Sequence, residues 1–164
     1  MQRVLSIREL KALSSGLNDV DFARQLGPFV LVQRPIAKPA HQTGGPKITQ
    51  PMRLIKPTSV LDFEELWVAT LPPLKSNDSF SLGRAPDCDL VLDEDTVSSR
   101  HARIDWREEY AQLEDLGSSN GTFVNGKKLT KPLRLADNDA VDFGGVQVLF
   151  FAVATLRRRM QESK

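Results

Sequence analysis

The amino-acid sequence predicts an all-β protein whose main part, residues 58–164, is an antiparallel β-sandwich of about 9–11 strands. Short apolar segments recur with frequent turns between them, and we expect strands near 64–71, 79–83, 89–92, 101–107, 110–115, 122–124, 132–135, 139–143 and 146–153. Ala102, Ile104 and Trp106 alternate with charged residues, as in a strand with one buried face. No helical periodicity interrupts the series, which favours two packed sheets.

Ahead of the sandwich, residues 1–33 predict a small helical appendage. Apolar residues recur at helical spacing over residues 3–13, namely Val4, Leu5, Ile7, Leu10 and Leu13. Asn18 or Asp19 is placed to cap a second helix over residues 20–26, because a short polar side chain can accept the first free amide protons of a helix. Phe29–Val32 is then strand-like.

Residues 34–57 predict a flexible linker between the appendage and the sandwich. The segment is poor in apolar residues and contains five prolines, at positions 35, 39, 46, 51 and 57. At the other end of the chain, residues 154–164 favour a short C-terminal helix. The expected domains are therefore 1–33, 34–57 and 58–164.

Composition indicates a soluble globular protein, with 40% hydrophobic and 26% charged residues in 164. No apolar run approaches the roughly 20 residues that cross a bilayer, and the N-terminus lacks the regions of a signal peptide. With Cys88 as its single cysteine the chain forms no internal disulfide, so we expect a cytoplasmic protein. Residues 1–57 carry a net charge of +6 and residues 58–164 a net charge of −5. A solvated tail is the favoured interpretation, and a tail docked on the body or on an acidic partner is the alternative.

Several classes of function lack support in the sequence. No cofactor loop, metal-ligand cluster or paired acid and base is present, so we expect neither an enzyme nor a bound cofactor or metal. Ser98 and His101 share one loop without a nucleophile elbow or an oxyanion element. Asp93, Glu94 and Asp95 are too few ligands for a calcium loop and favour a solvated acidic loop. The run of arginines at 157–159 is too small to indicate a nucleic-acid or membrane partner.

Three motifs follow one another inside the expected sandwich: Gly83-Arg84, Ser98-Ser99-Arg100-His101, and the segment 115–126, Asp-Leu-Gly-Ser-Ser-Asn-Gly-Thr-Phe-Val-Asn-Gly. The planar guanidinium of Arg84 can meet two oxygens of one phosphate. Ser98 and Ser99 supply hydroxyl and amide donors, and Arg100 adds a second positive charge. A phosphorylated side chain carries about −1.5 to −2 charges and several strong acceptors, so these donors suit a phosphate.

The three motifs in this order resemble the forkhead-associated (FHA) family, a β-sandwich that binds phosphothreonine peptides, over about residues 60–153. The resemblance implies six phosphopeptide-binding residues: Arg84, Ser98, Ser99, Arg100, Ser119 and Asn120. By this resemblance Arg84 and Ser98 contact the phosphate, and Asn120 holds the peptide main chain. It also implies three residues that support the site: Gly83, His101 and Gly121.

The function implied is a phosphothreonine-dependent protein-binding module that recruits phosphorylated partners in Ser/Thr-kinase signalling. The expected partner is a phosphothreonine-containing protein or peptide, either a kinase or the substrate of one. The alternative is a phosphate-independent structural interaction module that acts through the sandwich and the N-terminal appendage. Titration with phosphorylated and unphosphorylated peptides separates the two.

Three finer expectations follow from the resemblance. The family's usual Gly-Asp before its penultimate strand is Asn138-Asp139 here, and we expect Asn138 to adopt the positive φ. Thr96 lies where the family often reads the peptide after the phosphothreonine, and its acidic neighbours favour neutral, apolar or basic peptide residues there. The tail threonines Thr43, Thr49 and Thr58 are candidates for an autoinhibitory phosphosite, although a passive spacer is the favoured interpretation.

Overall fold

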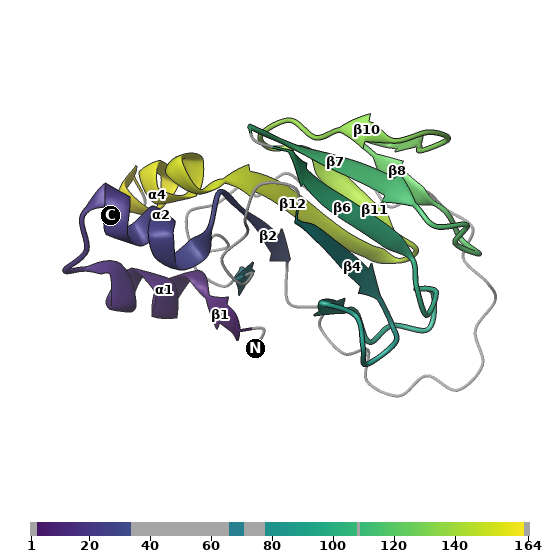
Figure 1. The fold of residues 1–164 in the computed structure, drawn as a ribbon. Helices are drawn as coiled ribbons and strands as arrows, with labels where there is room; N and C mark the ends of the chain where they lie inside the picture. The colour runs from purple at the N-terminus through teal and green to yellow at the C-terminus, as the bar shows by residue number, and fades with distance from the viewer. Residues whose placement is uncertain (1–2, 34–65, 71–77, 108, 163–164) are drawn as a thin grey trace.

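The computed structural model describes residues 3–33, 66–70, 78–107 and 109–162. The expected linker 34–57 and the three tail threonines lie outside these residues. In the described part, two β-sheets pack face to face and three helices gather at one end (Figure 1). None of these helices is long and apolar enough to cross a bilayer.

Each sheet is built mainly from antiparallel neighbours. The seven-stranded sheet has the order β1 (Arg3–Ser6), β3 (Trp67–Thr70), β2 (Phe29–Gln33), β12 (Val146–Ala152), β11 (Ala140–Phe143), β8 (Thr122–Val124) and β9 (Lys127–Lys128). The five-stranded sheet has the order β10 (Leu133–Arg134), β7 (Tyr110–Asp115), β6 (Ala102–Arg107), β4 (Ser79–Gly83) and β5 (Leu90–Val91), with β4 and β5 parallel. The predicted β-sandwich is confirmed.

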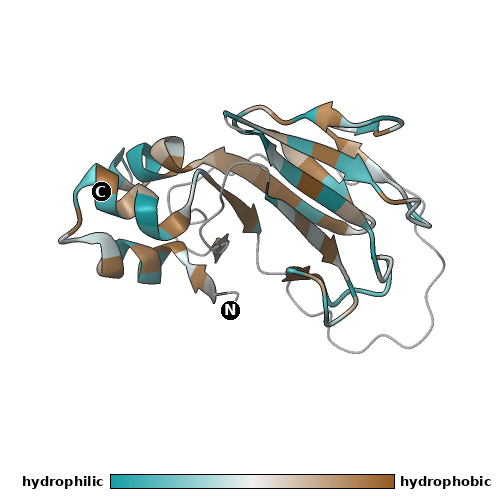
Figure 2. Ribbon diagram, in the orientation of Figure 1, coloured by the Kyte–Doolittle hydropathy of each residue, from teal (hydrophilic) through white to brown (hydrophobic). Residues whose placement is uncertain are grey.

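Alternation along the strands explains the packing of the two sheets. In β6, Ala102 and Ile104 are fully buried, whereas Arg103 and Asp105 lie on the outer face in an ion pair. The same alternation of apolar and polar residues is visible along the strands in Figure 2. One core, which includes Leu82, Ile104, Leu113, Phe143 and Val148, therefore fills the space between the sheets.

Strand β2 belongs to the centre of the seven-stranded sheet, where it pairs with β12 on one side and β3 on the other. The ring of Phe29 lies 4.9 Å from that of Phe150 and 5.5 Å from that of Trp106, so it contacts both sheets. Val30 is buried on the opposite face, beneath the helices. The segment expected to close a separate appendage is thus an internal strand of the sandwich.

The first helix is shorter than the sequence predicted, because residues 3–6 form strand β1 and pair with β3. Helix α1 (Ile7–Ser14) begins after Ser6, whose hydroxyl accepts the Glu9 amide proton over 3.2 Å. The Glu9 carboxylate in turn accepts the Ser6 amide proton over 2.8 Å, which completes a capping box. The expectation of helix from residue 3 is therefore corrected.

Helices α2 (Asp19–Leu26) and α4 (Val153–Glu162) complete the helical end, and Asn18 caps α2 as expected. The guanidinium of Arg157 lies 4.7 Å from the centre of the Phe22 ring and donates to the Leu17 carbonyl, which ties α4 to α2. A second core lies between these helices and the sheet: Ile7, Leu10, Phe22, Leu26, Val30, Val32, Leu66, Val68, Phe151, Val153, Leu156 and Met160. The loops that carry the three sequence motifs, 84–89, 92–101 and 116–121, project from the opposite end of the sandwich (Figure 1).

Candidate functional site

The register of three neighbouring strands brings the three sequence motifs to one edge. Leu82 at the end of β4 pairs with Ala102 at the start of β6, and Ala102 pairs with Asp115 at the end of β7. The loops 84–89, 92–101 and 116–121 therefore all emerge at the same end of the five-stranded sheet. Residues that are far apart in the chain become neighbours there.

Gly83 allows the first two of these loops to touch through their backbones. A Cβ at Gly83 would lie 2.3 Å from the Ser99 carbonyl oxygen, which is closer than any side chain permits. The amides of Arg84 and Ala85 donate to the carbonyls of Ser98 and Ser99, each over 3.0 Å. Glycine is thus required at 83 by the close approach of the loop that carries Ser98.

His101 is fully buried beneath the loops and joins two of them. Its Nδ1 accepts the Ser98 amide proton over 3.1 Å, so Nε2 carries the proton and donates to the Gly121 carbonyl over 3.0 Å. The imidazole packs edge-on against Phe143, with ring centres 5.7 Å apart. Burial lowers the pKa of His101, against the opposing effects of the Gly121 hydrogen bond and the Asp115 charge. The neutral ring is a brace inside the molecule.

Two hydrogen bonds join the second loop to the third. The Ser98 hydroxyl oxygen accepts the Ser119 amide proton over 3.0 Å, which leaves the hydroxyl proton available to a ligand oxygen. The Asn120 side-chain amide donates to the Thr96 carbonyl over 2.7 Å. The Thr96 hydroxyl accepts the Gly145 amide proton over 2.8 Å, so Thr96 links the loop to the β11–β12 turn.

Asp115 shapes the third loop, a role that the sequence motif alone did not reveal. Its carboxylate accepts the amide protons of Gly117 and Ser118 and the hydroxyl protons of Ser118 and Thr122, over 2.5–3.0 Å. Burial acts to raise the pKa of Asp115, but these four hydrogen bonds outweigh it and hold the pKa below its ordinary value. The loop that presents Ser119 and Asn120 is therefore fixed from within.

Arg84 extends from the end of β4 toward the second loop. Its Nη1 lies 3.5 Å from Oδ1 of Asp95, and its side chain remains 45% exposed. At this distance in solvent the pair contributes little to stability, so the guanidinium can exchange the carboxylate for a ligand. Arg84, Ser98 and Asn120 thus share one exposed edge, in the part of the chain that the structure describes.

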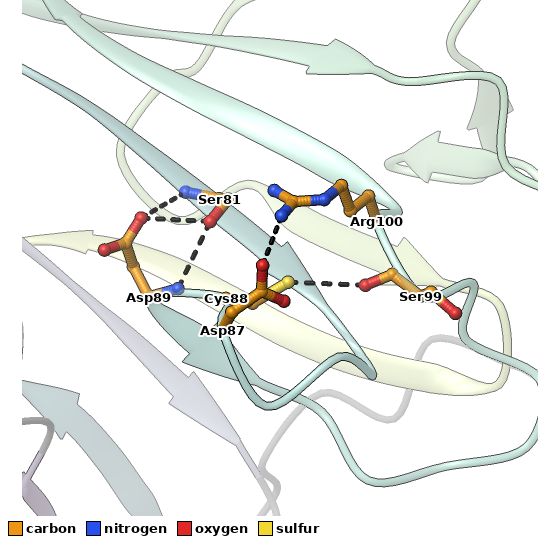
Figure 3. Close-up of polar contacts among 6 residues, drawn as sticks. All are labelled: Ser81, Asp87, Cys88, Asp89, Ser99 and Arg100. Atoms are coloured by element: carbon orange, nitrogen blue, oxygen red, sulfur yellow. Dashed lines mark hydrogen bonds and ion pairs between the residues drawn. The ribbon is translucent and has the colours of Figure 1, made fainter.

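Arg100 is engaged by a carboxylate of the first loop. Its guanidinium forms an ion pair with Asp87 of the first loop, as Figure 3 shows. Beside it, the Cys88 thiol donates to the Ser99 carbonyl over 3.3 Å, and Ser81 binds the Asp89 carboxylate through its amide and hydroxyl (Figure 3). The Arg100 and Cys88 contacts join the first loop to the Ser98–Arg100 segment, and the Ser81 contacts join it to β4. The sequence did not single out Asp87, because this residue lies outside the three motifs.

The turn before β11 keeps its shape without glycine. Asn138 has φ 71°, so the expectation of a positive φ at this residue is confirmed. Arg159 of α4 donates to its side-chain oxygen over 2.8 Å. Asn138 therefore supplies the positive φ at this turn without a glycine.

The arrangement can hold an anion with several hydrogen-bond acceptors. Arg84 supplies the charge and the Ser98 hydroxyl a neutral donor. Within the described residues no group of three or more His, Cys, Asp or Glu is placed to hold a metal ion.

Part of this chain is similar to known proteins. Residues 80–144 match the family described as FHA domain. The FHA domain-containing protein FhaB of Mycobacterium tuberculosis is 43% identical over 63 residues, 38% of this chain and 41% of that protein. The FHA domain of the CT664 protein from Chlamydia trachomatis is 32% identical, with a TM-score of 0.46 over 48% of this chain and 80% of that chain. An FHA domain from Arabidopsis thaliana, 18% identical, has a TM-score of 0.50 over 78% of this chain and 88% of that chain and shares the fold. The chain spans less than half the length of FhaB.

Proposed function

Residues 80–144 place this chain in the forkhead-associated family, and we propose that it binds phosphothreonine-containing proteins and recruits them in Ser/Thr-kinase signalling. One observation carries the proposal: Arg84 and Ser98 reach the same edge from different loops, and a buried neutral His101 holds that edge in shape. The loop that carries Ser98 is held in shape before a ligand arrives, which reduces the entropy cost of binding.

In this proposal each site residue has a separate task. The Arg84 guanidinium and the Ser98 hydroxyl bind phosphate oxygens, and Ser99, exposed on the same loop, adds a hydroxyl. Asn120 and Ser119 face the peptide beside the phosphothreonine. Arg100 acts mainly through its ion pair with Asp87. Hydrogen bonds to a charged group contribute more than neutral ones, so Arg84 is the most important member of the site.

The proposal is tested by calorimetric titration of the full chain with one peptide in three forms: phosphothreonine, phosphoserine and unphosphorylated. We expect binding only to the phosphorylated forms, with phosphothreonine favoured because burial of one methyl group contributes about 0.8 kcal/mol. Arg84→Ala should weaken binding by at least about 2 kcal/mol. Arg103→Ala is the matched control, since Arg103 forms its ion pairs on the outer face of β6. Equal affinity of wild type and Arg84→Ala would exclude this site.

A second candidate is a phosphate-independent interaction module. It is favoured by two exposed apolar side chains at the helical end, Leu13 and Val20, which are 63% and 64% accessible. Partner binding that survives Arg84→Ala and is lost in Leu13→Ser would support this function instead.

A further inference from the structure

The edge proposed to receive a phosphate carries more negative than positive charge. The loops 84–89 and 92–101 contain two arginines and five carboxylates, which are Asp87, Asp89, Asp93, Glu94 and Asp95. The third loop, 116–121, has no charged residue. A phosphothreonine that binds here therefore brings about two negative charges to an acidic surface.

One of these carboxylates competes directly with the phosphate. Oδ1 of Asp95 lies 3.5 Å from Nη1 of Arg84, so a phosphate oxygen bound to this guanidinium would lie beside the carboxylate. The Asp95 side chain is otherwise fully exposed. When a phosphate occupies Arg84, Asp95 loses its cation and stands beside a dianion.

Neither Arg100 nor movement of the loop relieves that repulsion. Arg100 is already paired with Asp87. The acidic segment lies between Leu92 and Val97, which are 5% and 1% exposed and anchor both its ends in the core. The Leu92 amide donates to the Gly83 carbonyl and the Val97 amide to the Glu94 carbonyl, each over 2.9 Å. The backbone that carries the three carboxylates is therefore anchored at both ends beside Arg84.

We propose that Asp95, with Asp93 and Glu94, selects phosphothreonine peptides that carry a lysine or arginine close to the phosphothreonine. The inference rests on the proposed function, because it assigns a specificity to the same site. When Arg84 moves from Asp95 to the phosphate, a lysine or arginine of the peptide can form an ion pair with Asp95 in its place. A peptide with a neutral neighbour leaves Asp95 unpaired, and a peptide with an acidic neighbour adds a further repulsion.

The test uses synthetic phosphothreonine peptides in an alanine background, with a lysine or an aspartate placed at one position at a time on either side of the phosphothreonine. Wild-type protein should favour the best lysine peptide over the matching aspartate peptide by about tenfold, the sum of several exposed charge interactions. Asp95→Asn should reduce this ratio to about threefold or less and should tighten binding of the all-alanine peptide. Glu109→Gln, which changes the net charge equally in the turn at the far end of β6, should leave the ratio unchanged.

The dependence of peptide affinity on salt concentration provides a second measurement. Because added salt screens attraction and repulsion alike, it should weaken binding of the lysine peptide more than that of the alanine peptide. The ratio between lysine and aspartate peptides should fall toward one in wild type. An Asp95→Asn variant that binds the alanine peptide more weakly would contradict the proposal and make Asp95 a brace for Arg84. An unchanged ratio in Asp95→Asn would also overturn it. If no phosphorylated peptide binds at all, the proposed function fails, and this inference with it.

Discussion

His101 accepts the backbone amide proton of Ser98 at Nδ1, over 3.1 Å, from a position with no exposure to solvent. The loop proposed to bind phosphate is therefore supported from beneath by a ring buried in the interior. The second ring nitrogen reaches the Gly121 carbonyl, so a single side chain fixes two of the three site loops.

Replacement of His101 should affect stability and binding together. His101→Ala leaves the Ser98 amide and the Gly121 carbonyl without partners in the interior, and we expect a loss of at least about 2 kcal/mol in the free energy of unfolding. Urea denaturation measures this loss, and peptide titration should show weaker binding in the same variant. A variant with native stability but no binding would place His101 in contact with the ligand.

The same histidine predicts a pH dependence of stability. Burial lowers the pKa of His101 in the folded state, whereas the unfolded chain takes up the proton near its ordinary value of about 6.5. The unfolded state thus binds more protons below that pH, so the free energy of unfolding should be constant above about pH 7 and fall as pH drops through about 6.5. His101→Gln should remove this fall. Wild-type stability that rises on acidification over this range would contradict the neutral brace.

Two partly buried carboxylates should respond in opposite ways to the same substitution. Asp115→Asn loses hydrogen bonds that favour the charged form, and at pH 7 it should lower the free energy of unfolding by about 1–3 kcal/mol. Asp142→Asn should be neutral or stabilising at pH 7, because burial raises the pKa of Asp142 against the weaker effect of the Gln147 hydrogen bond. Urea denaturation of both variants measures the two changes in the free energy of unfolding. A larger loss in Asp142→Asn than in Asp115→Asn would reverse the assignment.

Alanine substitution of Gly83 tests the close approach of the first two loops, and the same substitution at Gly16 is the control. The Gly83→Ala methyl group would meet the Ser99 carbonyl, so we expect a loss of about 1–3 kcal/mol in stability and weaker peptide binding. A Cβ at Gly16 meets no atom within 4 Å, so Gly16→Ala should stay within about 0.5 kcal/mol of wild type. Similar results for the two variants would show that the loops have room to separate.

The N-terminal segment should be indispensable to the sandwich. Removal of residues 1–33 deletes β2 from between β12 and β3 and exposes both cores. We expect the shortened chain to lose cooperative thermal unfolding, whereas Leu13→Ala, at an exposed position of α1, should retain it. A shortened chain that keeps the native melting temperature and binds phosphopeptide would instead establish residues 1–33 as a separate appendage.

The sequence predicted most strands of the sandwich because their signal is local. In β6 the alternation of buried and polar residues is complete within a few positions, and the bounds of β4, β7 and β8 agree with the prediction. The place of β2 depends on its pairing with β12, whose residues lie more than a hundred positions later. Its run of four buried residues, Phe29–Val32, was nevertheless a signal of burial on both faces.

In the candidate site too, some features could be predicted from local sequence and others could not. Arg84, Ser98 and His101 were predictable because their motifs have a fixed spacing, and Asn138 because asparagine tolerates a positive φ. The ion pair of Arg100 with Asp87 depends on how two loops lie against each other, which local sequence does not determine. The four hydrogen bonds of Asp115 depend on the same loop geometry.

The central claim, that the three loops form one phosphothreonine site, is tested most directly by amide NMR of the full chain during titration with a phosphothreonine peptide. The largest shifts should fall on Arg84, Ser98, Ser99, Ser119 and Asn120, and the unphosphorylated peptide should cause none of them. Shifts at the helical end around Leu13 and Val20, with the loops unchanged, would contradict the claim.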